Sequence, residues 1–139
     1  MNNQKNIVLC GVGGQGTVLA SKLLAAAAMS KDIPVMSAET IGMAQRGGSV
    51  FSHLRMGDNL YSPMIETGTA DLIIGFEPGE TVRMLPYLKD HGHIVVSTRA
   101  VKPVTATLSG SDYDAPQMLE YLKAAVPNLT LVNADQACA

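Results

Sequence analysis

Short apolar runs alternate along this chain with longer segments of helix-forming residues. Most of the apolar runs lie beside a glycine or proline, as is typical of parallel strands buried on both faces. These runs are residues 7–10, 34–38, 71–76, 93–97 and 129–132. The helix-like segments are residues 17–30, 79–89 and 115–126. The alternation predicts an α/β fold, a three-layer doubly wound and mostly parallel sheet of the Rossmann-like kind.

Three local features refine this prediction. Residues 7–38 form a strand–helix–strand unit, which we expect to cross over right-handed. Residues 49–56 and 59–61 flank Gly57-Asp58, a dipeptide typical of tight turns, so we expect an antiparallel hairpin excursion there. Pro86 should end or kink the helix predicted over residues 79–89.

The helix predicted over residues 17–30 is apolar almost all round. Its polar residues are Thr17, Ser21, Lys22 and Ser30. A helix of this kind is usually buried on more than one side, which indicates a surface for a partner.

The composition supports a single domain over residues 1–139. Hydrophobic residues make up 47% of the chain and aromatic residues 4%, which suits aliphatic strands covered by Ala- and Leu-rich helices. A formal net charge of -2 argues against a nucleic-acid partner, which calls for a basic surface. The sequence shows neither a signal-peptide core nor an apolar stretch long enough to span a bilayer, so we expect no membrane partner and a cytoplasmic location.

The cysteines and the end of the sequence lead to two further predictions, one about metal sites and one about the extent of the domain. Cys10 and Cys138 are too few for a disulfide framework, a metal site or an iron–sulfur cluster, so no metal site is predicted. The sequence stops at Ala139, at the start of another helix-like segment. We therefore expect the domain to be truncated at its C-terminus.

A glycine-rich turn is the first candidate binding site. Gly11, Gly13 and Gly16 fit the pattern G-x-G-x-x-G directly after a strand and before a helix. Glycines permit close backbone approach, and the helix N-terminus attracts anions. The cofactor-binding candidates here are Gly11, Gly13, Gly14, Gln15, Gly16 and Thr17. The alternative is that the glycines only permit a tight turn.

Glu39 stands at the end of the second strand, where a dinucleotide site requires an acidic residue. An autonomous NAD-binding module is therefore an alternative function. The rest of the chain offers no clear acid–base pair for a dehydrogenase, and Glu39 can equally cap or line the loop that follows.

A second glycine-rich segment supplies the remaining candidates, Arg46, Gly47, Gly48 and Ser49. The guanidinium and the glycine amides can form an anion-binding concavity. The alternative is a bulge with Arg46 exposed or paired with a carboxylate. Because both glycine loops follow the carboxyl ends of strands, we expect them to face one crevice.

Four other residues carry reactive or ionisable side chains but have no clear role, and no catalytic residue is predicted. His53 and Arg55 share one face of a strand, and either could reach the crevice. Glu77 can cap the following helix. The thiol of Cys10 has either a pKa lowered by the nearby helix dipole or the inert character of a small buried side chain.

Several of these segments together resemble a known family, the gamma subunit or domain of the thiamine-dependent pyruvate and 2-oxoacid:ferredoxin oxidoreductases. The resembling segments are residues 11–17, 39–50, 52–55, 61–63, 70–71 and 76–78. The loop over residues 42–48 is most similar to the indolepyruvate:ferredoxin branch, in its beta subunit.

The resemblance implies a non-catalytic subunit of a complex that decarboxylates a 2-oxoacid oxidatively to acyl-CoA. Partner subunits would hold thiamine diphosphate, Mg and iron–sulfur clusters, and ferredoxin would accept the electrons from the complex. Coenzyme A is the candidate ligand at residues 11–17 and 46–49, and the isolated chain should be inactive. A purely structural interaction subunit remains an alternative, and members of the family usually continue beyond the equivalent of residue 135.

Overall fold

The computed structural model describes residues 4–41, 48–101 and 114–133. One six-stranded sheet forms the centre, with strand order β2-β3-β1-β4-β5-β6. The strands are β1 Lys5–Val12, β2 Val35–Ile41, β3 Ser49–Met56, β4 Ala70–Gly75, β5 Leu88–Ser97 and β6 Leu129–Val132. β1, β4, β5 and β6 are parallel, whereas β3 is antiparallel to both β1 and β2.

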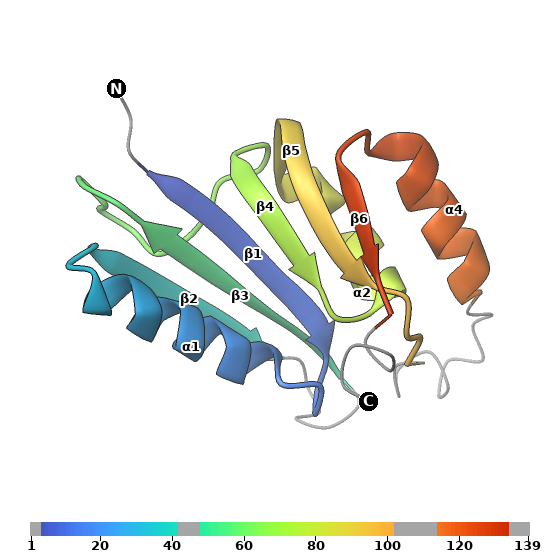
Figure 1. Cartoon of the computed structure of the whole chain (residues 1–139), viewed down its shortest axis with the longest axis horizontal. Helices are drawn as coiled ribbons and strands as arrows, with labels where there is room; N and C mark the ends of the chain where they lie inside the picture. Colours follow the sequence, from blue (N-terminus) through green and yellow to red (C-terminus); the bar gives the residue numbers. More distant parts are fainter. Residues whose placement is uncertain (1–3, 42–47, 102–113, 134–139) are drawn as a thin grey trace.

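Helices cover both faces of this sheet (Figure 1). They are α1 Thr17–Ser30 on one face, and α2 Pro78–Arg83, the 3-10 turn η1 Leu85–Tyr87 and α4 Ala115–Ala125 on the other. Successive side chains of a strand point to opposite faces, so β1 serves both cores. Val8 and Cys10 belong to the core beneath α2 and α4, and Leu9 belongs to the core beneath α1. The predicted three-layer α/β fold is confirmed.

Several elements occur where the sequence predicted them. The helix over residues 17–30 and the strand over residues 49–56 have the expected bounds. Helix α2 ends at Arg83, and Pro86 lies in η1, so the expected break before residue 89 is present. α4 and β6 also match their predicted segments to within one residue.

The predicted hairpin at Gly57-Asp58 is wrong. Residues 59–61 form no strand, and β3 instead pairs with β1 on one side and β2 on the other. The segment after β3 is held by a side chain rather than by a strand ladder. The Arg55 guanidinium donates to the Ser62 carbonyl at 2.9 Å and to the Asn6 side chain at 3.0 Å.

The strand–helix–strand unit also differs from the simple prediction. β2 runs parallel to β1, but β3 lies between them, so the two strands joined by α1 are not neighbours. Eight rungs of antiparallel pairing join β1 to β3, and seven join β2 to β3. This antiparallel part is the excursion that the sequence predicted, built from different strands.

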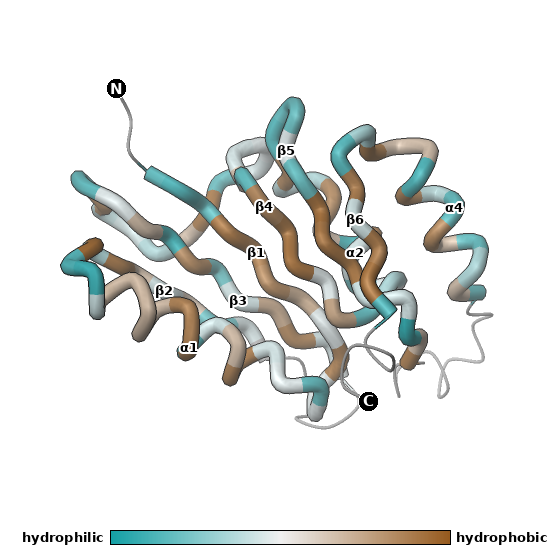
Figure 2. The backbone as a smooth tube through the Cα atoms, viewed as in Figure 1, coloured by the Kyte–Doolittle hydropathy of each residue, from teal (hydrophilic) through white to brown (hydrophobic). Residues whose placement is uncertain are grey.

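Helix α1 lies on the sheet through small residues and Leu24, and it exposes two other leucines. Ser21 and Ala28 are buried against the sheet, whereas Leu19 and Leu23 are 61% and 62% exposed. Figure 2 shows hydrophobic positions on the turns of α1. The burial of this face by a partner stays a prediction. Among the described helices none is both long and apolar enough to cross a membrane.

Candidate anion-binding site

The first glycine loop joins β1 to α1. β1 continues through Gly11 to Val12, so the turn itself begins at Gly13. Gly14 and Gly16 have φ angles of 98° and 88°, a left-handed conformation that favours glycine. Gly16 is also the N-cap of α1, and no side chain of the described part of the chain caps that helix end.

An open hollow of about 500 Å³ lies at this helix end. Gly13, Gly14, Gly16 and Thr17 line it from the loop side, and Val50 lines it from β3. The backbone amides of a first helical turn carry partial positive charge and lack partners within the helix. The hollow is therefore placed where a phosphate or carboxylate group is stabilised.

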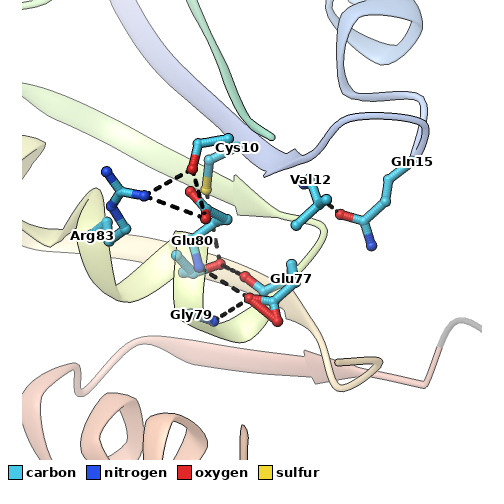
Figure 3. Close-up of polar contacts among 9 residues, drawn as sticks. Cys10, Val12, Gln15, Glu77, Gly79, Glu80 and Arg83 are labelled. Atoms are coloured by element: carbon cyan, nitrogen blue, oxygen red, sulfur yellow. Dashed lines mark hydrogen bonds and ion pairs between the residues drawn. The ribbon is translucent and has the colours of Figure 1, made fainter. Parts of the chain in front are cut away.

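Gln15 fastens the loop to the sheet. Its side-chain oxygen accepts a hydrogen bond from the Val12 amide at 2.7 Å, and its nitrogen donates to the Phe76 carbonyl at 3.1 Å. Figure 3 shows Gln15 turned back toward Val12. Gly11 leaves room for this arrangement, because a Cβ there would lie 2.9 Å from the Gln15 oxygen. Gln15 thus orders the loop with both of its polar atoms.

Thr17 is the other polar side chain at the loop. It is 3% exposed, and its hydroxyl has no hydrogen-bond partner within the described residues. A buried hydroxyl without a partner costs about 1–3 kcal/mol. Thr17 is the first residue of α1 and one of the residues that line the hollow, and its hydroxyl lies beneath the loop, 2.7 Å from where a Cβ of Gly11 would be.

The first glycine loop contacts the described end of the second glycine-rich segment. The Gly13 amide donates to the Gly48 carbonyl at 2.7 Å. Ser49 follows directly, and its hydroxyl donates to the Glu80 carboxylate at 2.9 Å and accepts from Arg83 at 2.8 Å. Ser49 is therefore held by α2. The candidates Arg46 and Gly47 lie outside the described residues.

Glu39 does not come to the glycine loop. It is exposed on β2 and pairs with Ser52 of β3, which in turn pairs with Leu9 of β1. Neighbouring strands are about 4.8 Å apart, so β2 lies about 10 Å from β1. A dinucleotide site needs its acidic residue on the strand next to the first one. The intervening β3 therefore disfavours binding of a dinucleotide.

One buried carboxylate caps α2 and a second lies within the helix. Glu77 is fully buried, and its carboxylate accepts hydrogen bonds from the amides of Gly79 and Glu80, which confirms the expected helix cap. Glu80 was not singled out from the sequence. It is 3% exposed, and burial raises the pKa of its carboxyl group, although Ser49 and Arg83 oppose that shift. The sequence feature that could have indicated Glu80 is an acidic residue inside a short helix that directly follows a core strand.

His53 and Cys10 lie in the core, away from the crevice. His53 is completely buried, its Nδ1 accepts from the Ile65 amide at 2.9 Å, and burial lowers its pKa. Burial raises the pKa of the Cys10 thiol to about 12, so the interpretation as a small buried side chain holds and a dipole-lowered pKa is wrong. The described residues contain no group of three His, Cys, Asp or Glu side chains able to hold a metal ion.

The chain is thus a three-layer α/β domain of the Rossmann-like kind, with a glycine turn between a buried strand and a helix and with one antiparallel strand inserted in the sheet. Residues 6–137 match the model of the pyruvate ferredoxin/flavodoxin oxidoreductase family, and the chain belongs to that family. The resemblance found in the sequence is confirmed.

Several relatives in this family are named as subunits of 2-oxoacid oxidoreductases. The chain is 39% identical over 132 residues to indolepyruvate oxidoreductase subunit IorB of Archaeoglobus fulgidus, covering 94% of this chain and 65% of that protein. Against the same subunit of Methanothermobacter thermautotrophicus it is 42% identical over 108 residues, covering 78% and 55%. Against the pyruvate/ketoisovalerate oxidoreductases common subunit gamma of Thermococcus kodakarensis it is 29% identical, covering 89% and 61%. The chain thus spans less than two thirds of the length of these relatives.

Solved structures share the fold. Pyruvate oxidoreductase subunit PORC from Thermotoga maritima has a TM-score of 0.63 at 19% identity, covering 94% of this chain and 62% of that one. A 2-oxoglutarate:ferredoxin oxidoreductase from Magnetococcus marinus, with 2-oxoglutarate, coenzyme A and succinyl-CoA bound, has a TM-score of 0.65 at 16% identity. That match covers 96% of this chain and 20% of the other.

Proposed function

We propose that this chain is a non-catalytic gamma-type subunit of a thiamine-dependent 2-oxoacid:ferredoxin oxidoreductase, with indolepyruvate as the 2-oxoacid. The observation that carries the proposal is the family match over residues 6–137. The choice of indolepyruvate is supported by the 39% identity to a protein named as an indolepyruvate oxidoreductase subunit.

In this proposal the chemistry takes place in partner subunits. They bind thiamine diphosphate, Mg and iron–sulfur clusters, decarboxylate the 2-oxoacid oxidatively to acyl-CoA, and pass electrons to ferredoxin. The chain by itself is inactive. Its own contribution is to bind a phosphate group of coenzyme A at the first glycine loop.

The geometry of the loop supports a phosphate ligand. Gly14 and Gly16 adopt left-handed conformations that bring the backbone close to the hollow. The N-terminus of α1 lacks a side-chain cap, and the buried Thr17 hydroxyl lacks a partner among the described residues. A phosphate oxygen can accept hydrogen bonds from amides of this kind. Coenzyme A is the ligand to test because a protein that contains this fold in 20% of its chain was solved with coenzyme A bound.

Purification of the natural chain under gentle conditions tests the subunit assignment. We expect thiamine-binding and iron–sulfur subunits to copurify with the chain, and the assembly to reduce ferredoxin with indolepyruvate and coenzyme A. A chain that purifies alone from cells that express those subunits would count against the assignment.

Calorimetric titration of the assembly tests the ligand. We expect heat of binding with coenzyme A, a weaker response with dephospho-coenzyme A if the 3′-phosphate is the group bound, and none with NADH. Selective binding of NADH would favour the alternative of a dinucleotide module. Full activity in the variants Gly13→Ala and Arg46→Ala would favour a purely structural subunit.

A further inference from the structure

We propose that Glu80 is a positioning residue that, through Ser49, holds Gly48 against the first glycine loop. The inference rests on the proposed function, because the site that Glu80 orders is the anion-binding site at the first glycine loop. Glu80 itself contacts no ligand in this arrangement.

Successive hydrogen bonds connect α2 to the first loop. The Ser49 hydroxyl donates to Glu80 at 2.9 Å, and Ser49 directly follows Gly48 in the chain. The Gly48 carbonyl accepts from the Gly13 amide at 2.7 Å. Figure 3 shows Glu80 and Arg83 on α2 beside the strand that leads to Val12 and Gln15. A shift of Ser49 would therefore move the carbonyl that holds Gly13.

Arg83 completes the contact on the solvent side. Its guanidinium donates to the Ser49 hydroxyl at 2.8 Å and lies 3.5 Å from the Glu80 carboxylate. The hydroxyl thus accepts from Arg83 and donates to Glu80, so it is used both as an acceptor and as a donor. The two contacts restrain the orientation of the Ser49 hydroxyl as well as its distance from α2.

Helix α2 is a rigid support for Glu80 because it lies directly on the sheet. A Cβ at Gly75, the last residue of β4, would be 1.8 Å from the Thr81 hydroxyl oxygen, so only glycine allows this approach. The same hydroxyl donates to the Glu77 carbonyl at 2.8 Å. Glu77 caps the helix before Glu80, and Thr81 packs on Gly75 directly after it, so the backbone is held on either side of Glu80.

Stability alone gives little reason for a carboxylate at this position. Glu80 is 3% exposed, its partner Arg83 is 62% exposed, and Glu77 is a second acid nearby that also raises the pKa of Glu80. Well-packed apolar side chains often replace buried ion pairs without loss of stability. A carboxylate supplies what an apolar side chain lacks, a directional acceptor for the Ser49 hydroxyl.

Kinetics of the assembled complex test the inference. The variants are Glu80→Ala, Ser49→Ala and Glu80→Gln, and each is assayed for kcat, for KM of coenzyme A and of the 2-oxoacid, and for melting temperature. We expect Glu80→Ala and Ser49→Ala to raise the KM of coenzyme A about tenfold, equivalent to about 1.4 kcal/mol, with kcat and the KM of the 2-oxoacid unchanged. Glu80→Gln keeps an oxygen that accepts from Ser49, so it should stay within about threefold of the wild type.

The matched control is Glu120→Ala on α4. Glu120 is exposed and pairs only with Lys123 among the described contacts, at 3.2 Å, so its loss should leave the KM of coenzyme A unchanged. If Glu80→Ala prevents assembly, Ser49→Ala removes the same hydrogen bond without emptying a buried volume and decides the question.

Three results would overturn the inference. An unchanged KM of coenzyme A with a lowered melting temperature would make Glu80 a structural residue only. A Glu80→Gln variant as impaired as Glu80→Ala would show that the charge, and not the contact with Ser49, matters. A wild-type complex whose rate does not saturate with coenzyme A would overturn the proposed function as well, which the first two results leave intact.

Discussion

The substitution Gln15→Glu tests whether Gln15 orders the glycine loop. The two side chains have almost the same shape, and one oxygen of the introduced carboxylate can still accept from the Val12 amide. The second oxygen takes the place of the nitrogen that donates to the Phe76 carbonyl at 3.1 Å. Two acceptors then face each other, so one hydrogen bond is lost and a carbonyl is left unpaired.

The expected loss follows from that change. Removing one donor so that a partly buried acceptor is unsatisfied costs about 1–3 kcal/mol, and we take about 2 kcal/mol. In a chain of this length about 1 kcal/mol corresponds to about 3–4 °C, so the melting temperature should fall by about 7 °C.

The stability of the Gln15→Glu variant should depend on pH. When the introduced carboxyl group is protonated it can donate to the Phe76 carbonyl, so the folded state raises the pKa of this group above its unfolded value. The stability from that bond is present below the ordinary carboxyl pKa, about 4.3, and is lost as the pH rises through the raised value. The deficit of Gln15→Glu should therefore be large near neutral pH and shrink near about pH 4.

Thermal unfolding followed by circular dichroism measures both quantities. The charge-matched control is Gln117→Glu, at an exposed position in the first turn of α4, where we expect a change within about 0.5 kcal/mol. Equal melting temperatures for the wild type and Gln15→Glu at neutral pH, or a deficit independent of pH, would refute the structural role of Gln15.

Three other measurements follow from the same region. Gly16 has φ 88° with no atom within 4 Å of an added Cβ, so Gly16→Ala should cost about 1–2 kcal/mol from backbone strain alone and Gly16→Asn less, as urea unfolding can show. Burial raises the pKa of Glu80, so the wild type should lose stability relative to Glu80→Gln as the pH rises above the ordinary carboxyl range; denaturant midpoints at about pH 4 and about pH 8 that differ equally would contradict this. The thiol of Cys10, with its pKa raised to about 12, should resist iodoacetamide in the folded chain and react only after unfolding, and mass spectrometry of the labelled peptide would reveal the opposite.

Local patterns predicted the elements well because each pattern depends on residues close in sequence. The run of leucines and alanines in α1 and the alternation in β3 contain enough information for their bounds. The partner of β3 depends on residues far away in the chain. Gly57-Asp58 does mark the end of a strand, but nothing local shows that β3 inserts between β1 and β2.

The candidate site also has parts that local sequence predicted and parts that it did not. The glycine turn and its position before a helix were visible in the sequence, and the left-handed conformations of Gly14 and Gly16 agree with them. The roles of Gln15 and Glu80 could not be foreseen, because each pairs with residues that only the folded sheet brings near. Gln15 reaches Phe76, 61 positions away, and Glu80 reaches Ser49, 31 positions away.

The central place of β1 has a consequence for synthesis of the chain on the ribosome. β1 is the first strand made, yet both of its neighbours come later, β3 ending at Met56 and β4 ending at Gly75. Until Gly75 has emerged, the apolar residues of β1 lack one of their two neighbouring strands. Nascent chains shorter than this should therefore be the ones that bind holdase chaperones, and protection from protease should begin only beyond that length.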